Sequence, residues 1–326
     1  MKSALLVFSL IPVLSFSQPY PLSIDIVMDK STYIQDEPIY AEFKIKNSGN
    51  TPVPSDPNLM ASEYFKIKIE DENGLPIEPM NVHYDSFGIS SFKLSPGDSL
   101  WFVVDLQELG DKKHLDLAHN GISFFPPGKY TVTATYQNSL FRLIDLLNNE
   151  KGSINQAKIL AARNHPEDKY ISSRSFIVEE PSGSLMNIHS QYLNALRNHN
   201  TAIRNHDPYS AYLSLFDFFN NQRSSPFAIK AANLMVLELG YVNYAERMNY
   251  PRPDSLFQYY QTINNMGVAN MVVYLPKIAQ RSESEKNLSR GEWLRAVYNK
   301  ALTENPNSRA SEYILKNKNT NLFISN

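Results

Sequence analysis

The spacing of apolar residues changes at Pro181, and this change constrains the fold more than any other feature. Before it, apolar and polar residues alternate in short segments separated by turn dipeptides such as Asn73-Gly74. After it, apolar residues recur every three or four positions and glycines become few. A period of two is typical of strands and a period near 3.6 of helices. The sequence therefore predicts two domains, a β half over residues 18–181 and a helical half over 184–326.

Strict alternation marks the strands of the β half. It runs from Tyr40 to Lys46, from Tyr64 to Glu70 and from Tyr130 to Tyr136. Alternation places one face of a strand on a core and the other in water. With turn signals between the segments, about seven short strands are expected, and such a pattern favours an antiparallel β-sandwich.

Three groups of residues in this half carry a resemblance to known domains. They are Tyr33 with Glu37-Pro38-Ile39 and Asn47, then Leu94 with Pro96-Gly97, and then Pro127-Gly128-Lys129-Tyr130-Thr131-Val132. The β half resembles bacterial immunoglobulin-like domains, including the sandwich of BsuPI-type proteinase inhibitors. The resemblance implies an immunoglobulin-like sandwich. It also implies an alternative function, a proteinase inhibitor that acts through a sandwich loop.

The connection between the last two predicted strands is unusually long and is predicted to hold a helical insertion, 138–165. Leu140 to Leu147 and Ile154 to Arg163 both have helical patterns. Two roles are open for it. It packs against the helical half and sets the angle between the halves, or it forms a binding tip at the end of the sandwich. The first role is favoured, because a run as apolar as 140–147 is costly to expose.

Helix start signals divide the second half. Asp207-Pro208, Ser225-Pro226 and Pro253-Asp254 each combine proline with a polar residue that suits a helix start. About seven helices are expected, the first with an apolar face from Leu185 to Ile203. A helix over 268–278 is expected to be kinked or broken near its proline.

One stretch of the helical half resembles a known repeat. Tyr298, Ala301-Leu302, Pro306 and Ala310 are similar to the junction between tetratricopeptide repeats (TPR), where small residues let two helices pack closely. The resemblance implies a TPR-like all-α domain. Stacked helix pairs of that kind leave a concave surface that holds a peptide or protein segment.

Tyrosines cluster in the middle of this half and are the candidate binding residues. Tyr241, Tyr244, Tyr259 and Tyr260 offer large contact areas at a small loss of conformational entropy. They form a partner-binding face in one interpretation and fill the interfaces between helices in the other.

No pattern in the chain indicates catalysis or a cofactor. The sequence has no cysteine, and His199 and His206, seven positions apart, have no third ligand at a spacing that suits a metal. We therefore expect no catalytic residue, no metal and no cofactor, and a non-enzymatic protein. An enzyme with a site between the halves is kept as an alternative. The formal net charge of −2, with no basic stripe, argues against nucleic acid as a partner.

The first residues have the layout of a secretory signal. Lys2 precedes an apolar run from Ala4 to Leu14, and Ser15 and Ser17 stand where a signal peptidase reads. Residues 1–17 are expected to be removed by cleavage after Ser17. We expect a periplasmic or secreted bacterial protein, without a membrane span and, lacking cysteine, without a lipid anchor. Its predicted role is an interaction or scaffold module of the envelope that binds a protein or peptide partner.

Overall fold

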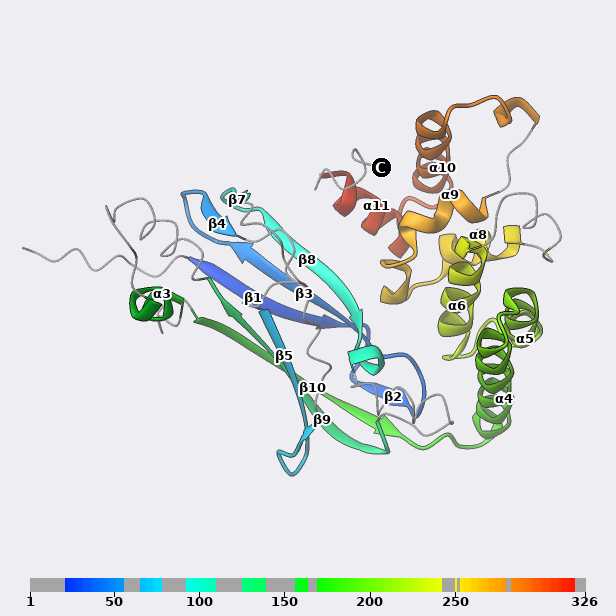
Figure 1. The fold of residues 1–326 in the computed structure, drawn as a ribbon, viewed down its shortest axis with the longest axis horizontal. Helices are drawn as coiled ribbons and strands as arrows, with labels where there is room; N and C mark the ends of the chain where they lie inside the picture. Colours follow the sequence, from blue (N-terminus) through cyan, green and yellow to red (C-terminus); the bar gives the residue numbers. More distant parts are fainter. Residues whose placement is uncertain are drawn as a thin grey trace, which may run out of the picture.

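The computed structural model describes residues 21–55, 65–77, 92–109, 125–138, 156–163, 169–241, 250, 253–279 and 283–319. The predicted signal sequence, the run 140–147 and Tyr244 lie outside these residues. Within them the chain has a β half followed by a helical half (Figure 1), as the sequence predicts. The last strand ends at Glu179 and the first helix of the second half begins at Ser184.

The described strands of the β half form two main sheets and one small sheet. The first sheet has the order β1 (Leu22–Met28), β3 (Tyr40–Asn47), β8 (Ser99–Asp105). The second has the order β2 (Thr32–Ile34), β10 (Lys169–Glu179), β9 (Gly128–Gln137), β5 (Phe65–Asp71), β6 (Pro76–Ile77). The small sheet pairs β4 (Val53–Ser55) with β7 (Phe92–Leu94). Apart from the parallel pair β2–β10, neighbouring strands are antiparallel.

The two main sheets enclose one apolar core, so the β half is a sandwich. Phe43 and Phe102 of the first sheet pack on Phe65 of the second, with ring centroids 5.0–5.6 Å apart. The inward residues are those that the alternation predicts. Gly74 (φ 75°) and Gly97 (φ 81°) adopt the left-handed conformation in the turns at Asn73-Gly74 and Pro96-Gly97, which glycine does without a steric penalty.

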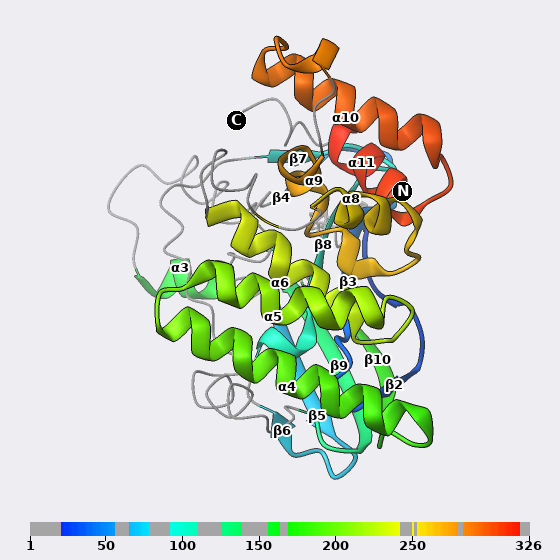
Figure 2. The same cartoon turned by 90° about the vertical axis from the view of Figure 1, so that its right-hand side faces the viewer.

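The described residues of the second half form seven α-helices and short 3-10 turns, whose arrangement Figure 2 shows. The helices are α4 (Ser184–Arg204), α5 (Pro208–Asn221), α6 (Ala228–Tyr241), α8 (Pro253–Thr262), α9 (Leu275–Ile278), α10 (Arg290–Glu304) and α11 (Arg309–Asn319). At the start of α5, the Asp207 carboxylate accepts a hydrogen bond from the Ser210 N–H at 3.0 Å, the predicted cap.

One predicted helix is wrong. Residues 268–278 do not form a helix that breaks near Pro276. They form the ends of η4 (Met266–Val268), then η5 (Val272–Tyr274) and α9. Pro276 lies in the first turn of α9, where its missing N–H costs nothing, so it begins a helix and does not interrupt one.

The helical half docks on the outer face of the β1–β3–β8 sheet. Tyr40 and Val103, which point away from the sandwich core, belong to the apolar core of the helices. Asn233 of α6 donates to the Tyr40 hydroxyl at 2.8 Å and to the Gly267 carbonyl at 3.3 Å. Its own carbonyl accepts from the Tyr260 hydroxyl at 2.7 Å. One buried amide therefore joins β3, α6, α8 and η4.

Four acid–base pairs cross this interface among the described residues, and in each the acid comes from the β half. The pairs are Asp29–Arg309 (3.4 Å), Asp36–His189 (2.6 Å), Glu42–Lys316 (2.8 Å) and Asp105–Lys230 (2.9 Å). Burying charges costs desolvation energy that the pairing only offsets. The pairs therefore select one docking orientation more than they add stability.

The described part of the insertion is α3 (Gln156–Arg163), which confirms the helical pattern over 154–163. Its position does not fit the favoured packing role for this part of the insertion, whereas the run 140–147, on which that role was based, lies outside the described residues. In Figure 1, α3 lies at the end of the sandwich opposite to the helical half, and most of its residues are exposed. This part of the insertion does not set the angle between the halves, which the interface contacts of β3 and β8 do instead.

Candidate functional site

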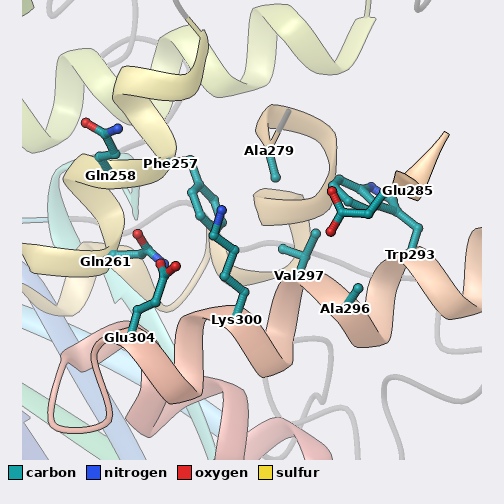
Figure 3. A pocket seen from close by; sticks show the side chains of 10 residues that line it. All are labelled: Phe257, Gln258, Gln261, Ala279, Glu285, Trp293, Ala296, Val297, Lys300 and Glu304. Carbon is teal, nitrogen blue, oxygen red and sulfur yellow. The ribbon is translucent and has the colours of Figure 1, made fainter. Parts of the chain in front are cut away.

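A pocket of about 330 Å³ lies between α8 and α10 (Figure 3). Its apolar lining consists of Phe257, Ala279, Trp293, Ala296 and Val297. Its polar lining consists of Gln258, Gln261, Glu285, Lys300 and Glu304. It therefore combines an aromatic floor with a charged rim.

Local sequence explains why the floor is rigid. A capping box starts α10, in which the Ser289 hydroxyl accepts from the Glu292 N–H and the Glu292 carboxylate accepts from the Ser289 N–H. Trp293 and Val297, four and eight residues after Ser289, lie on the buried face of the helix. The Trp293 indole N–H donates to the Pro276 carbonyl at 2.9 Å. With its N–H held by the scaffold, the indole presents its ring surface to the pocket.

The rim places carboxylates at both ends of the pocket. In Figure 3, Glu285 lies beside Trp293 at one end, and Glu304 lies beside Gln261 at the other. The Gln261 amide donates to Glu304 at 3.1 Å. Between them, the Lys300 ammonium lies 5.8 Å from the centre of the Phe257 ring, within the range of a cation–π contact.

A second, more open groove of about 600 Å³ runs between α4 and α5. Side-chain amides and hydroxyls dominate its lining, with Asp217 as its charged group and with Ala195, Leu213 and Phe218 as apolar members. Phe218 is the aromatic residue of its lining. This groove therefore lacks the pair of aromatic side chains that lines the pocket between α8 and α10.

The structure places two of the four candidate tyrosines in the core. Tyr260 is fully buried and donates to Asn233. Tyr259 is 8% exposed and packs edge-on against Phe219 at 4.9 Å. Burial raises the pKa of both phenols. These two side chains fill interfaces between helices and are not part of an exposed face. Tyr241 ends α6, and Tyr244 lies outside the described residues.

The two histidines do not share a face. His199 is buried, and its Nε2 lies 3.1 Å from a Glu238 carboxylate oxygen. The polar residues around His199, Asn198 and Asn200, suggest a solvated helix end, but the His199 side chain is not part of one. His206 follows the end of α4 and has φ 58°. Among the described residues, no group of three or more His, Asp or Glu side chains has a geometry that suits a metal ion.

Reasoning from sequence missed the pocket residues, although a signal for them exists. Trp293, Val297 and Lys300 are spaced at i, i+4 and i+7, and Phe257 and Gln261 at i and i+4. Each set lies on one face of a helix. An aromatic followed one or two turns later by a polar or charged residue on a mostly buried face marks the border between core and surface, where a pocket can form.

Comparisons with known proteins leave the family open. No family model matches the chain, and no curated protein does. The solved structures that it is similar to include the CARDB domain of a Pyrococcus furiosus protein, in complex with two metal ions, at 15% identity and a TM-score of 0.21. That match covers 49% of this chain and 97% of the domain.

Two Bacillus subtilis proteins are similar at 11% identity. Spo0M, a sporulation control protein, has a TM-score of 0.23, and the match covers 55% of each chain. A protein described as a lipoprotein has a TM-score of 0.19, and the match covers 93% of this chain and 82% of that one. Scores this low do not establish a shared fold. In the part of the chain that the structure describes, no helix has the length and apolar character that crossing a membrane requires.

Proposed function

We propose that this chain is an exported, non-enzymatic interaction protein of the bacterial envelope that binds a peptide segment of a partner between α8 and α10. The observation that carries the proposal is the floor formed by Phe257 and Trp293 under a polar rim. Aromatic residues in desolvated pockets supply much of the binding energy at protein interfaces. Export is proposed from the signal layout of residues 1–17.

The size of the pocket supports a peptide side chain as the ligand. Its volume of about 330 Å³ is at the lower end of the roughly 300–1,000 Å³ that ligand pockets span. A large side chain with part of its backbone fits such a space better than a whole nucleotide cofactor does. The polar rim then has donors and acceptors for the backbone next to that side chain.

We also infer the finer fold types from the resemblances, an immunoglobulin-like sandwich of the BsuPI kind and TPR-like helix pairing. Supporting the second, Ala301 of α10 and Ala310 of α11 are both buried, as small residues at a close helix crossing are. Pro306 lies in the connection between the two helices. Stacked helix pairs of this type leave a concave surface that a partner can bind.

Filling the pocket tests the proposed function. Ala296 lines the pocket from α10, whereas Asn299 is exposed on the same helix outside its lining. A displayed peptide library and an envelope extract are each presented to wild-type protein, to Ala296→Phe and to Asn299→Phe. We expect ligands that bind the wild type and Asn299→Phe but not Ala296→Phe.

Equal capture by all three proteins, or capture by none, would contradict the proposal. A protease that all three capture equally well would favour the inhibitor alternative, in which a loop of the β half is the contact. Circular dichroism of each variant confirms that the larger side chain leaves the helices intact.

A further inference from the structure

We propose that the pocket between α8 and α10 accepts a basic side chain, a guanidinium or ammonium group, from a partner peptide. The inference rests on the proposed function and names the chemistry of its ligand. It starts from Lys300, whose ammonium lies 5.8 Å from the centre of the Phe257 ring. The aromatic floor thus already attracts a cation from within the chain.

The charges on the rim favour a cation. Its lining has two carboxylates, Glu285 and Glu304, against the single ammonium of Lys300. Figure 3 shows the two carboxylates at opposite ends, so a side chain that enters between them meets a negative charge on either side. The Gln261 amide donates to one oxygen of Glu304, which orients the carboxylate and leaves its other oxygen for a ligand N–H.

The aromatic groups suit a flat cation in particular. The Trp293 N–H is bonded to the Pro276 carbonyl, so the indole contributes a π surface and no donor to the pocket. An arginine stacks its planar guanidinium on such surfaces while it donates to carboxylates at its edge. An anionic ligand finds one favourable partner here, Lys300, and two repulsive ones.

The position of Lys300 predicts whether removal of its charge strengthens or weakens ligand binding. Lys300 is exposed, and its ammonium group is at the end of a flexible aliphatic stem. An incoming cation therefore displaces this ammonium group from Phe257. Removing its charge therefore helps a basic ligand, because it removes both a competitor and a repulsion. The same substitution weakens the binding of an acidic ligand.

Calorimetry with defined peptides tests this. The probes are capped pentapeptides that differ only in the central residue: arginine, its neutral isostere citrulline, leucine or glutamate. We expect arginine to bind about fivefold or more tightly than citrulline, and Lys300→Gln to tighten arginine binding about threefold, as charge contacts near a surface allow. Glu304→Gln should weaken it by about the same factor. Arg295→Gln, an exposed cation of α10 outside the lining, is the matched control and should change nothing.

The inference is overturned if the citrulline, leucine or glutamate peptide binds as tightly as the arginine peptide, if Lys300→Gln weakens the arginine peptide, or if the arginine peptide does not bind. The proposed function is overturned separately, when no ligand from the library or the extract is sensitive to Ala296→Phe. If the selected ligands depend on an open pocket but have no basic residue, the proposed function stands and the inference of a basic ligand is refuted.

Discussion

Adding one methyl group at Gly267 should loosen the contact between the two halves. Gly267 lies in η4, which packs against β3. A Cβ placed on it would lie 2.6 Å from Tyr40 Cζ and closer still to Cε2, with Asn265 Oδ1 at 3.0 Å. Real Cβ atoms do not approach other atoms so closely, so either Tyr40 or η4 must move.

Tyr40 has little room to move. Its side chain is buried, and its hydroxyl accepts from Asn233 at 2.8 Å. Overpacking of this kind costs about 1–3 kcal/mol. If Tyr40 moves away from Asn233, a buried amide loses a partner at a further cost of about 1–3 kcal/mol. With both costs, we therefore expect Gly267→Ala to lower the free energy of unfolding by about 2–6 kcal/mol.

Urea denaturation followed by circular dichroism at 222 nm measures this loss. Gly291 of α10 provides the matched control, since a Cβ there meets nothing within 4 Å. Gly291→Ala should be neutral or stabilise by up to about 1 kcal/mol, because alanine is the better helix former. The losses caused by Gly267→Ala and by Tyr40→Leu should be less than additive in the double variant, because leucine removes the ring atoms that the new Cβ meets. An unchanged midpoint for Gly267→Ala would show that Tyr40 does not pack against η4 and would refute the docked arrangement.

Three further predictions concern the interface and export. Burial raises the pKa of Asp29, although the hydrogen bond from the Met266 N–H and the charge of Arg309 lower it. The folded protein therefore holds this proton more tightly than the unfolded chain does. The resulting stabilisation is fully present below pH 3.8 and is lost as the pH rises through the raised pKa of the folded state. Asparagine does not titrate, so the melting temperature of Asp29→Asn should rise relative to that of the wild type between pH 3 and pH 7. A difference in melting temperature that stays constant with pH would contradict this. Lys316→Met leaves the buried Glu42 carboxylate without its ammonium partner at 2.8 Å, so unfolding experiments at pH 7 should show a loss of about 1–3 kcal/mol, and none if Glu42 is well hydrated. N-terminal sequencing of the exported protein by mass spectrometry should give a start at Gln18, and a start at Met1 would refute cleavage after Ser17.

Local patterns in the sequence predict the elements of this fold well. Alternation over 40–46 and 130–136 matches β3 and β9, because each strand has one face on the sandwich core. Asp207-Pro208 begins α5 at the expected residue because its cap needs only neighbours within one turn. Signals of this kind are local, so they can be interpreted without knowledge of the rest of the structure.

The docking of the halves was not predictable in this way. Alternation assigns Tyr40 and Glu42 to the face of β3 that points away from the sandwich core, which by itself predicts exposure to solvent. Both are buried, since helices far along the chain cover that face. Asn233 is separated from Tyr40 by 193 positions, and no periodicity links them. The same limit applies to the tyrosines of α8, for which composition does not say which face of the helix packs.

The candidate pocket is of intermediate predictability. Trp293 and Phe257 each have the spacing of a core residue, and both are in fact nearly buried. What makes them a site is that α8 and α10 leave a gap of about 330 Å³ between them. The size of that gap depends on the relative position of the two helices, which the connection through α9 determines. This position is a property of the assembled helical half and not of either helix alone.

Hydrogen–deuterium exchange tests the central claim most directly, the claim that a partner peptide binds between α8 and α10. Exchange is measured by mass spectrometry on the full chain with and without a library-selected peptide. Bound peptide should slow exchange in 253–262 and in 290–304, and should leave α4, α5 and the β half unchanged. Protection confined to the groove between α4 and α5, or to the loops of the sandwich, would contradict the account.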